Sequence, residues 1–119
     1  MASGIRISIN LENCTGPLTV KDGALLKLEE AIKSVKVSVC ATKHHVFSDD
    51  TVTWIAILEE SHAAVSTYLG ARHVTVDIHM CHETQDNTEL ARDVGRTLAD
   101  IFKAENVIES EKNWTSKKS

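Results

Sequence analysis

The sequence predicts an α+β fold, a two-layer sandwich in which a mostly antiparallel sheet carries two helices on one face. Strand-like runs alternate apolar and polar residues, and two segments place apolar residues at helical spacing. The expected order is strand, helix, four strands, helix and strand. Because each helix must bury one apolar stripe, both can pack on the same side of the sheet. The 119 residues, 42% hydrophobic, suffice for a single domain spanning 1–119.

The first elements follow from simple patterns. Residues 5–11 alternate as a strand does, and the glycine and the only proline of residues 13–17 indicate a turn. Apolar residues at helical spacing predict a helix from about Asp22, a candidate N-cap, to Ser34. Three valines then alternate with polar residues, so we expect the helix to pass into a second strand over residues 35–40.

Residues 43–50 are mostly polar, and we expect them to connect two strands. The adjacent His44 and His45 would point in opposite directions on a strand, which favours a solvated loop over a metal site. Residues 51–58 are almost continuously apolar and predict a central strand. A turn or bulge at residues 59–60 would then re-aim the side chain that follows.

The strand predicted from Arg72 to Cys81 alternates most strictly. A shorter strand over residues 63–68 precedes it, and Gly70 lies in the turn between them. The polar face of the long strand carries His73, Thr75, Asp77, His79 and Cys81. Such a face ordinarily meets solvent, which is the alternative to a chemical role. We expect it to lie on the sheet face that the helices leave free, available for dimer packing.

The C-terminal third predicts a helix and an edge strand. Residues 86–89 resemble a capping box, and apolar residues at helical intervals predict a helix to about Ala104. Residues 107–108 are expected to form a last edge strand. We expect residues 109–119 to be a frayed polar tail, in which Trp114 could dock on a neighbouring surface.

Composition excludes several classes of function. A net charge of -4 without a Lys/Arg cluster argues against a nucleic-acid partner. No apolar run reaches the roughly 20 residues of a membrane span, and the N-terminus lacks a secretory leader. Cys14, Cys40 and Cys81 are odd in number and lack C-x-x-C spacing, so neither a disulfide framework nor a zinc knuckle is expected. A reducing, cytoplasmic location follows.

The segment Glu60-Ser61-His62 after an apolar strand, with Cys81 twenty residues beyond Ser61, resembles the bacterial and archaeal S-adenosylmethionine decarboxylase proenzymes. The resemblance covers most of the chain, including the strand that runs into Cys14 and the step His45-Val46-Phe47. It implies an S-adenosylmethionine decarboxylase-like fold. It also implies self-cleavage between Glu60 and Ser61 into a β chain, 1–60, and an α chain, 61–119, with a homodimer of processed αβ units.

The resemblance further implies a self-generated pyruvoyl cofactor. The Ser61 hydroxyl would attack the preceding carbonyl, and elimination and hydrolysis would leave a ketone. That ketone forms a Schiff base with the amine of an amino-acid-type substrate and accepts the electrons released with carbon dioxide. Cys81 matches the proton donor, and an ordinary thiol holds its proton at neutral pH. Without the resemblance, Cys81 would be interpreted as a small buried hydrophobe. No G-x-S-x-G motif supports hydrolase chemistry instead.

The chain departs from the family at the processing histidine. The family places it five residues after the serine, where this chain has Ser66. The candidates to support processing here are Ser66, Thr53 or a nearby histidine such as His62.

A second departure concerns substrate binding. Phe47 matches an aromatic residue that stacks on adenine, and Tyr68 replaces a tryptophan while keeping a flat face. The proline and glutamate that follow in the family are Leu69 and Gly70 here. The resemblance therefore lacks the glutamate that holds the ribose hydroxyls.

These observations predict a pyruvoyl-dependent decarboxylase of polyamine biosynthesis. Adenosylmethionine is the family substrate and yields the aminopropyl donor for spermidine, while Gly70 leaves a basic amino acid such as arginine or ornithine open. Ser66 favours a further alternative, an unprocessed regulatory homologue without catalysis. A metal-binding module on His73, Asp77, His79 and Cys81 has suitable ligand types, but residues two apart on one strand need another element to converge on an ion.

Overall fold

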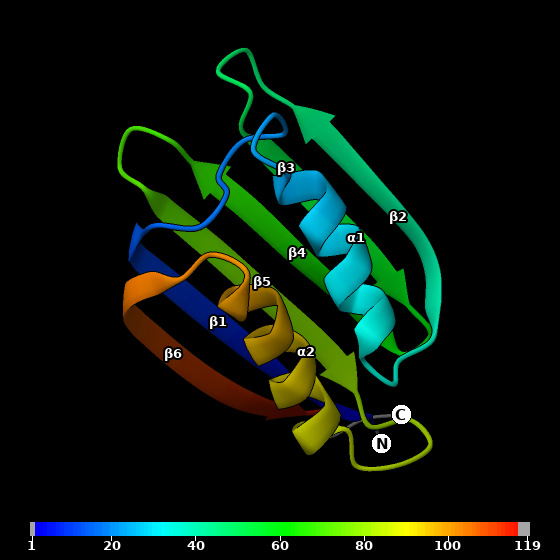
Figure 1. The fold of residues 1–119 in the computed structure, drawn as a ribbon. Coiled ribbons are helices and arrows are strands. Elements are labelled where there is room, and N and C mark those ends of the chain that lie inside the picture. Colours follow the sequence, from blue (N-terminus) through cyan, green and yellow to red (C-terminus); the bar gives the residue numbers. More distant parts are fainter. Residues whose placement is uncertain (1, 117–119) are drawn as a thin grey trace.

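A computed structural model describes residues 2–116 of the chain. The elements in chain order are β1 (Ser3–Cys14), α1 (Ala24–Ser34), β2 (Val39–Val46), β3 (Val52–Leu58), β4 (Ser61–Tyr68), β5 (His73–Cys81), α2 (Thr88–Asp100) and β6 (Ala104–Thr115). This order confirms the one predicted from the sequence (Figure 1). Within the described residues, no helix is long and apolar enough to cross a membrane.

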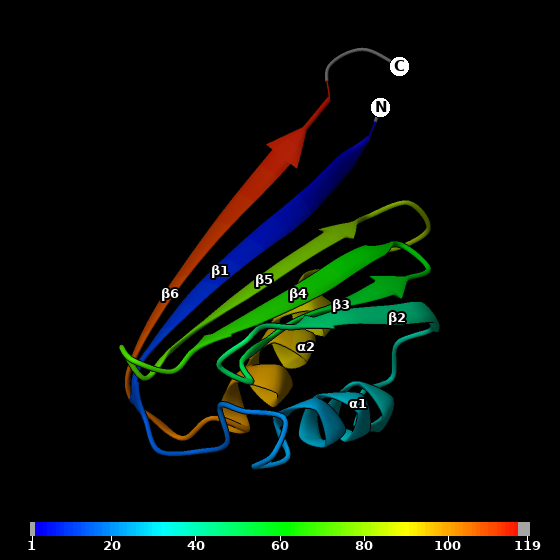
Figure 2. The ribbon, with the colours of Figure 1, turned by 90° about the horizontal axis from the view of Figure 1, so that it is seen from above.

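The strands form one antiparallel sheet in the order β2-β3-β4-β5-β1-β6. Both helices lie on the same side of it, and no other element of residues 2–116 covers the opposite face (Figure 2). The predicted α+β sandwich is therefore confirmed. The sheet alternates as expected, because buried positions on β4 and β5 are separated by residues of the uncovered face.

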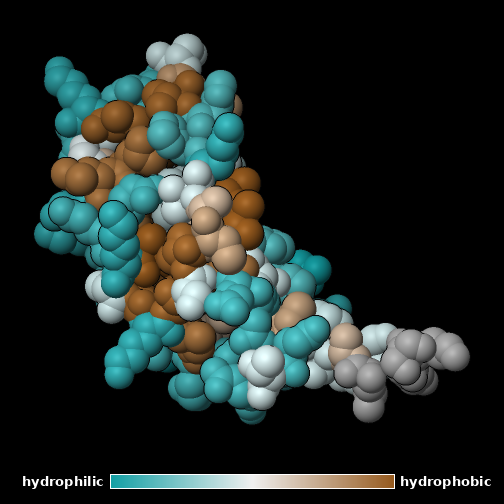
Figure 3. Space-filling view, turned by 90° about the vertical axis from the view of Figure 1, so that its right-hand side faces the viewer, coloured by the Kyte–Doolittle hydropathy of each residue, from teal (hydrophilic) through white to brown (hydrophobic). Residues whose placement is uncertain are grey.

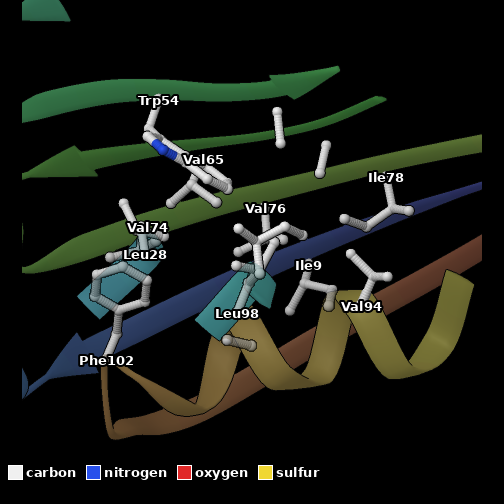
Figure 4. Packing of buried hydrophobic residues seen from close by; sticks show 14 of the residues in the cluster. Ile9, Leu28, Trp54, Val65, Val74, Val76, Ile78, Val94, Leu98 and Phe102 are labelled. Carbon is white, nitrogen blue, oxygen red and sulfur yellow. The ribbon is translucent and has the colours of Figure 1, made fainter. Parts of the chain in front are cut away.

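The core fills the space between the sheet and the helices. Phe102 follows α2 and is fully buried, and in Figure 4 it lies beside Val74 and Leu28. Leu98 of α2 points toward the sheet in the same view. Trp54 of β3 is also fully buried, and its indole N–H donates to Glu29 Oε2 of α1 at 2.7 Å. That bond satisfies the one polar atom of a large core side chain.

The prediction of a polar connection over residues 43–50 is wrong at its start. Residues 43–46 belong to β2, an edge strand whose residues are nearly all exposed. Of the predicted strand 35–40, only residues 39–40 are in a strand. An edge strand that covers little of the core carries no alternating apolar pattern. The strand was therefore predicted several residues before its actual position. His44 and His45 lie in successive positions opposite Trp54 and Thr53 of β3.

The prediction of a frayed tail after residue 108 is also wrong. β6 continues to Thr115 and pairs with β1 along its length, while residues 117–119 lie outside the described part of the chain. Its helix-facing Glu111 accepts from Arg92 of α2 at 2.6 and 2.9 Å, which lowers the pKa of Glu111. Charged pairs thus replace the apolar residues that would have identified the strand.

Both helix starts differ from the predicted ones. Helix α1 begins at Ala24 rather than at Asp22, and its N-cap is Gly23, whose φ of 97° suits glycine. The predicted capping box before α2 is not formed, because Asp86 Oδ1 accepts from the N–H of Thr88 while Glu89 pairs with Arg92.

Two further boundaries differ. Helix α2 ends at Asp100 rather than Ala104. Strand β3 is internal but lies only one place from the sheet edge. Its Ile55 and Ile57 are 39% and 50% exposed on the uncovered face, so the continuous apolar run does not mean burial on both faces. Seen from the side of β2, hydrophobic surface extends along the molecule between hydrophilic side chains (Figure 3).

Two phenylalanines test this description of the core. Phe102 is 0% exposed and Phe47 is 47% exposed. Truncation of a buried aromatic removes transfer free energy and leaves a cavity, so Phe102→Ala should lower the free energy of unfolding by about 3–5 kcal/mol. Phe47→Ala is the matched control and should cost much less. Urea unfolding at one protein concentration measures both, and equal losses would contradict the assignment of the core.

Candidate functional site

The candidate site begins at the tight turn between β3 and β4. Leu58 pairs with Ser61, and Glu59 and Glu60 form the turn between them. The predicted turn at residues 59–60 is confirmed, and the strands keep an unshifted register beside it. Ser61, half-buried, is the first residue of β4.

The side chain of Ser61 contacts a histidine on the neighbouring strand. Its Oγ lies 2.9 Å from Nδ1 of His79, on β5. The other ring nitrogen, Nε2, lies 3.1 Å from the indole Nε1 of Trp114, on β6. The sequence pattern did not link these residues, because strict alternation aligns Ser61 with the core-facing Ala63 and sets His79 on the other face. Ser61 has a φ of 157°, away from the usual antiparallel value of about −140°.

The carbonyl that precedes Ser61 has a hydrogen-bond donor of its own. The backbone N–H of Cys81 donates to the Glu60 carbonyl oxygen at 2.9 Å. A donor aimed at this oxygen would stabilise negative charge that builds up on it during attack by a nucleophile. The half-buried Cys81 and Ser61 also line the same cavity of ≈ 420 Å³, together with Leu58, Glu59, Glu60 and Glu83.

The side chain of Glu60 is anchored by the loop after β5. Its carboxylate accepts from the N–H groups of Glu83 and Thr84 at 3.2 and 3.3 Å, and from the Thr84 hydroxyl. The side-chain amide of Asn87 and these Thr84 and Glu83 donors lower the pKa of Glu60. Asn87 is 1% exposed and also donates to the Cys81 carbonyl at 2.8 Å. The loop therefore anchors Glu60 and the end of β5 that faces it.

The remaining predicted site residues gather at the other end of the sheet. Thr53 and Ser66 contact each other through hydroxyl oxygens 2.8 Å apart. They line a second cavity of ≈ 360 Å³, together with Phe47, Ser48, Asp49, Thr51, Thr67 and Tyr68. Strand β4 runs from Ser61 to Tyr68. At about 3.3 Å per residue, Ser66 lies roughly 17 Å and Tyr68 roughly 23 Å along the strand from Ser61.

Three polar side chains of β5, those of His73, Asp77 and His79, contact side chains on the adjoining strands. His73 Nε2 lies 3.1 Å from Asn10 Oδ1, and Asp77 Oδ1 accepts from Ser8 Oγ at 3.3 Å. The His79 ring contacts that of the exposed His62, with centroids 5.4 Å apart. Among residues 2–116 there is no group of three or more His, Cys, Asp or Glu side chains that could hold a metal ion.

Comparison with known proteins gives these residues a family context. The family model described as S-adenosylmethionine decarboxylase matches residues 6–112. The S-adenosylmethionine decarboxylase proenzyme of Methanococcus maripaludis strain C5 is 31% identical over 81 residues, 67% of this chain and 66% of that protein. The proenzyme of Thermodesulfovibrio yellowstonii is 28% identical over 85 residues, 70% and 62% of the two chains. The matched region thus spans slightly less than two thirds of these relatives.

A solved structure supports the fold. The adenosylmethionine decarboxylase from Aquifex aeolicus superimposes with a TM-score of 0.79, covering 98% of this chain and 95% of that one at 17% identity. At this identity the likeness concerns the fold alone. The family model, by contrast, spans nearly the whole chain, including Ser61 and Cys81. The chain belongs to the S-adenosylmethionine decarboxylase family.

Proposed function

We propose that the chain is a proenzyme that cuts itself between Glu60 and Ser61 and then acts as a pyruvoyl-dependent decarboxylase of polyamine biosynthesis, with adenosylmethionine as its substrate. One observation carries the proposal. The bond to be cut has a hydroxyl in contact with an imidazole on one side, and a carbonyl that accepts a backbone N–H on the other.

The cut needs no reagent other than the chain and water. Ser61 Oγ bonds to the Glu60 carbonyl carbon, the C–N bond breaks, and the nitrogen takes the proton that the hydroxyl gives up. The Cys81 N–H offsets the charge on the carbonyl oxygen during this exchange. Loss of the Ser61 α-proton then expels the Glu60 carboxylate. Water hydrolyses the resulting imine to the ketone, and the nitrogen leaves as ammonia. The products are chain 1–60 and chain 61–119, which begins with a ketone.

The residues around the cavity suit the decarboxylation that follows. A pyruvoyl group supplies a carbonyl that takes up the electron pair released with carbon dioxide. Cys81 shares the cavity with Ser61, so its thiol is placed to return a proton to the substrate α-carbon. Such a thiol must stay reduced, which fits a cytoplasmic location. Glu59, Glu60 and Glu83 surround the cavity with carboxylates, which favours a cationic substrate.

The site that we propose needs two copies of the chain. Ser61 and Cys81 lie at one end of the sheet, whereas Phe47 and Tyr68, the proposed adenine-stacking residues, lie at the other. A gap of roughly 23 Å along β4 is too long for one small substrate to bridge. In a two-fold dimer joined through the uncovered sheet faces, the Phe47 end of one copy meets the Ser61 end of the other.

Arginine or ornithine is the second candidate substrate. The turn Leu69-Gly70-Ala71-Arg72 offers no carboxylate to a ribose. A Cβ on Gly70 would meet no atom within 4 Å, so packing does not require glycine there. The fold would therefore accept a glutamate at position 70, and its absence bears on substrate binding rather than on packing. A chain that is never cut would instead favour the regulatory homologue.

Exchange of Cys81 tests the proton donor. Cys81→Ala keeps the backbone N–H, so the chain should still be cut, while carbon dioxide release should fall by about 10²–10⁴-fold. Cys40→Ala, on the exposed edge strand, is the matched control and should retain wild-type turnover. Release of label from carboxyl-labelled substrate measures both. Wild-type turnover in Cys81→Ala would remove Cys81 from the mechanism.

Substrate choice is tested by comparing adenosylmethionine, arginine and ornithine in the same assay. We expect the highest kcat/KM for adenosylmethionine. Gly70→Glu should raise it further, by about 10–100-fold, because a charged hydrogen bond contributes about 1.5–3 kcal/mol. The variant should leave turnover of arginine and ornithine unimproved. A wild-type preference for either basic amino acid would replace adenosylmethionine as the proposed substrate.

A charge on the uncovered sheet face tests the dimer. Ile57→Asp should give a monomer that is cut but turns over substrate poorly, since its two half-sites are separated. Leu26→Asp is the control, because Leu26 is 64% exposed on α1, in the helix layer. Sedimentation equilibrium and the decarboxylase assay read out the two effects. A fully active Ile57→Asp monomer would contradict the two-chain site.

A further inference from the structure

We propose that His79 is the base that takes the Ser61 hydroxyl proton during the cut, and that the indole of Trp114 restrains this step by holding the His79 ring in the opposite tautomer. The inference rests on the self-cleavage proposed above. It assigns the processing role to His79 on β5, and it assigns to Trp114 on β6 an inhibitory contact that slows the cut.

The tautomer follows from the two hydrogen bonds of the ring. An indole nitrogen only donates, so Nε2 of His79 must accept from Trp114 over the 3.1 Å between them. A neutral imidazole carries one proton, which then resides on Nδ1. Nδ1 therefore donates to Ser61 Oγ over their 2.9 Å distance and cannot take a proton from it. The pair is in contact, but in the arrangement that leaves the hydroxyl unactivated.

The ring is held neutral by its surroundings. Burial, followed by the positive charge of Arg6 and the neighbouring ring of His62, lowers the pKa of His79. Near neutral pH the position of a single proton, rather than the charge of the ring, thus distinguishes the restrained form from the competent one.

The other predicted processing residues do not take this place. His62, which follows Ser61 in the chain, is exposed, and its ring contacts that of His79. Ser66 and Thr53 contact each other at the far end of β4, roughly 17 Å away along the strand. Brought close by a second copy, Ser66 would still contribute a hydroxyl rather than an imidazole. Within residues 2–116, His79 is the histidine hydrogen-bonded to Ser61.

Gly4 leaves the space that the indole of Trp114 occupies. Trp114 pairs with Gly4 on β1, the strand that separates β6 from β5. A Cβ on Gly4 would lie 2.7 Å from Cε2 and Cζ2 of the indole, so the ring crosses β1 where a side chain is missing. The indole and imidazole centroids are then 5.5 Å apart.

Release of the indole allows the step to proceed. The His79 proton moves to Nε2, through solvent, and Nδ1 becomes an acceptor. Nδ1 then takes the Ser61 proton as Oγ bonds to the Glu60 carbonyl carbon, and returns a proton to the nitrogen as the C–N bond breaks. Protons and electrons balance without an added reagent.

The rate of self-cleavage tests the proposal, measured by intact mass on the full chain over time. Trp114→Phe keeps a ring over Gly4 but removes the N–H, and should be cut about 2–10-fold faster, the worth of one lost hydrogen bond. His79→Phe should be cut at least about 10²-fold more slowly. Ser110→Ala, on the same face of β6, is the control and should match the wild type.

A second readout follows the tautomer directly. In the uncut Ser61→Ala chain, the imidazole ¹⁵N signals should show Nδ1 protonated, and adding Trp114→Phe should move the proton toward Nε2. Unchanged ¹⁵N signals would overturn this inference. So would cutting of either Trp114→Phe or His79→Phe at the wild-type rate, and both results would leave self-cleavage itself in place. If no chain is ever cut, the wild type included, the proposed function fails and this inference fails with it.

Discussion

The register between β4 and β5 is the constraint on which the candidate site depends. It sets Ser61 opposite Met80, and so places the Cys81 N–H against the Glu60 carbonyl and His79 beside the serine hydroxyl. A slip of one residue would turn every side chain to the other face of the sheet. The fully buried Val65 and Val76, paired near the middle of the two strands, oppose such a slip. Core packing far from Ser61 thereby fixes the geometry around it.

The sequence predicted the parts of the fold that bury apolar surface. The alternation of β5, the two amphipathic helices and the order of all eight elements are confirmed. The edge strands β2 and β6 were misplaced because their partners are solvent and charged groups, as the Arg92–Glu111 pair illustrates. In the site, the family resemblance associated Ser61 with Cys81. The Ser61–His79 contact was missed, since it depends on the unusual φ of Ser61 at the start of β4. An alternating sequence pattern does not predict such a backbone angle.

In our proposal, His79 takes the place of the histidine that the family resemblance leads us to expect at position 66. Ser66 lies far along β4 from the Glu60–Ser61 bond, whereas His79 contacts Ser61 from the adjoining strand. In our proposal one sheet therefore carries two half-sites, a cutting centre at the Ser61 end and a binding cavity at the Phe47 end. A dimer unites them, and the length of β4 is the reason that one chain does not.

The central claim, that the Glu60–Ser61 bond is a self-cleavage site, is tested most directly by the intact mass of the purified wild-type chain. The account predicts two fragments, 1–60 and 61–119, the second lighter than a serine-started chain by the replacement of its amine with a ketone oxygen and the loss of its hydroxyl. A single species with the full mass of 119 residues, persisting through long incubation, would contradict it.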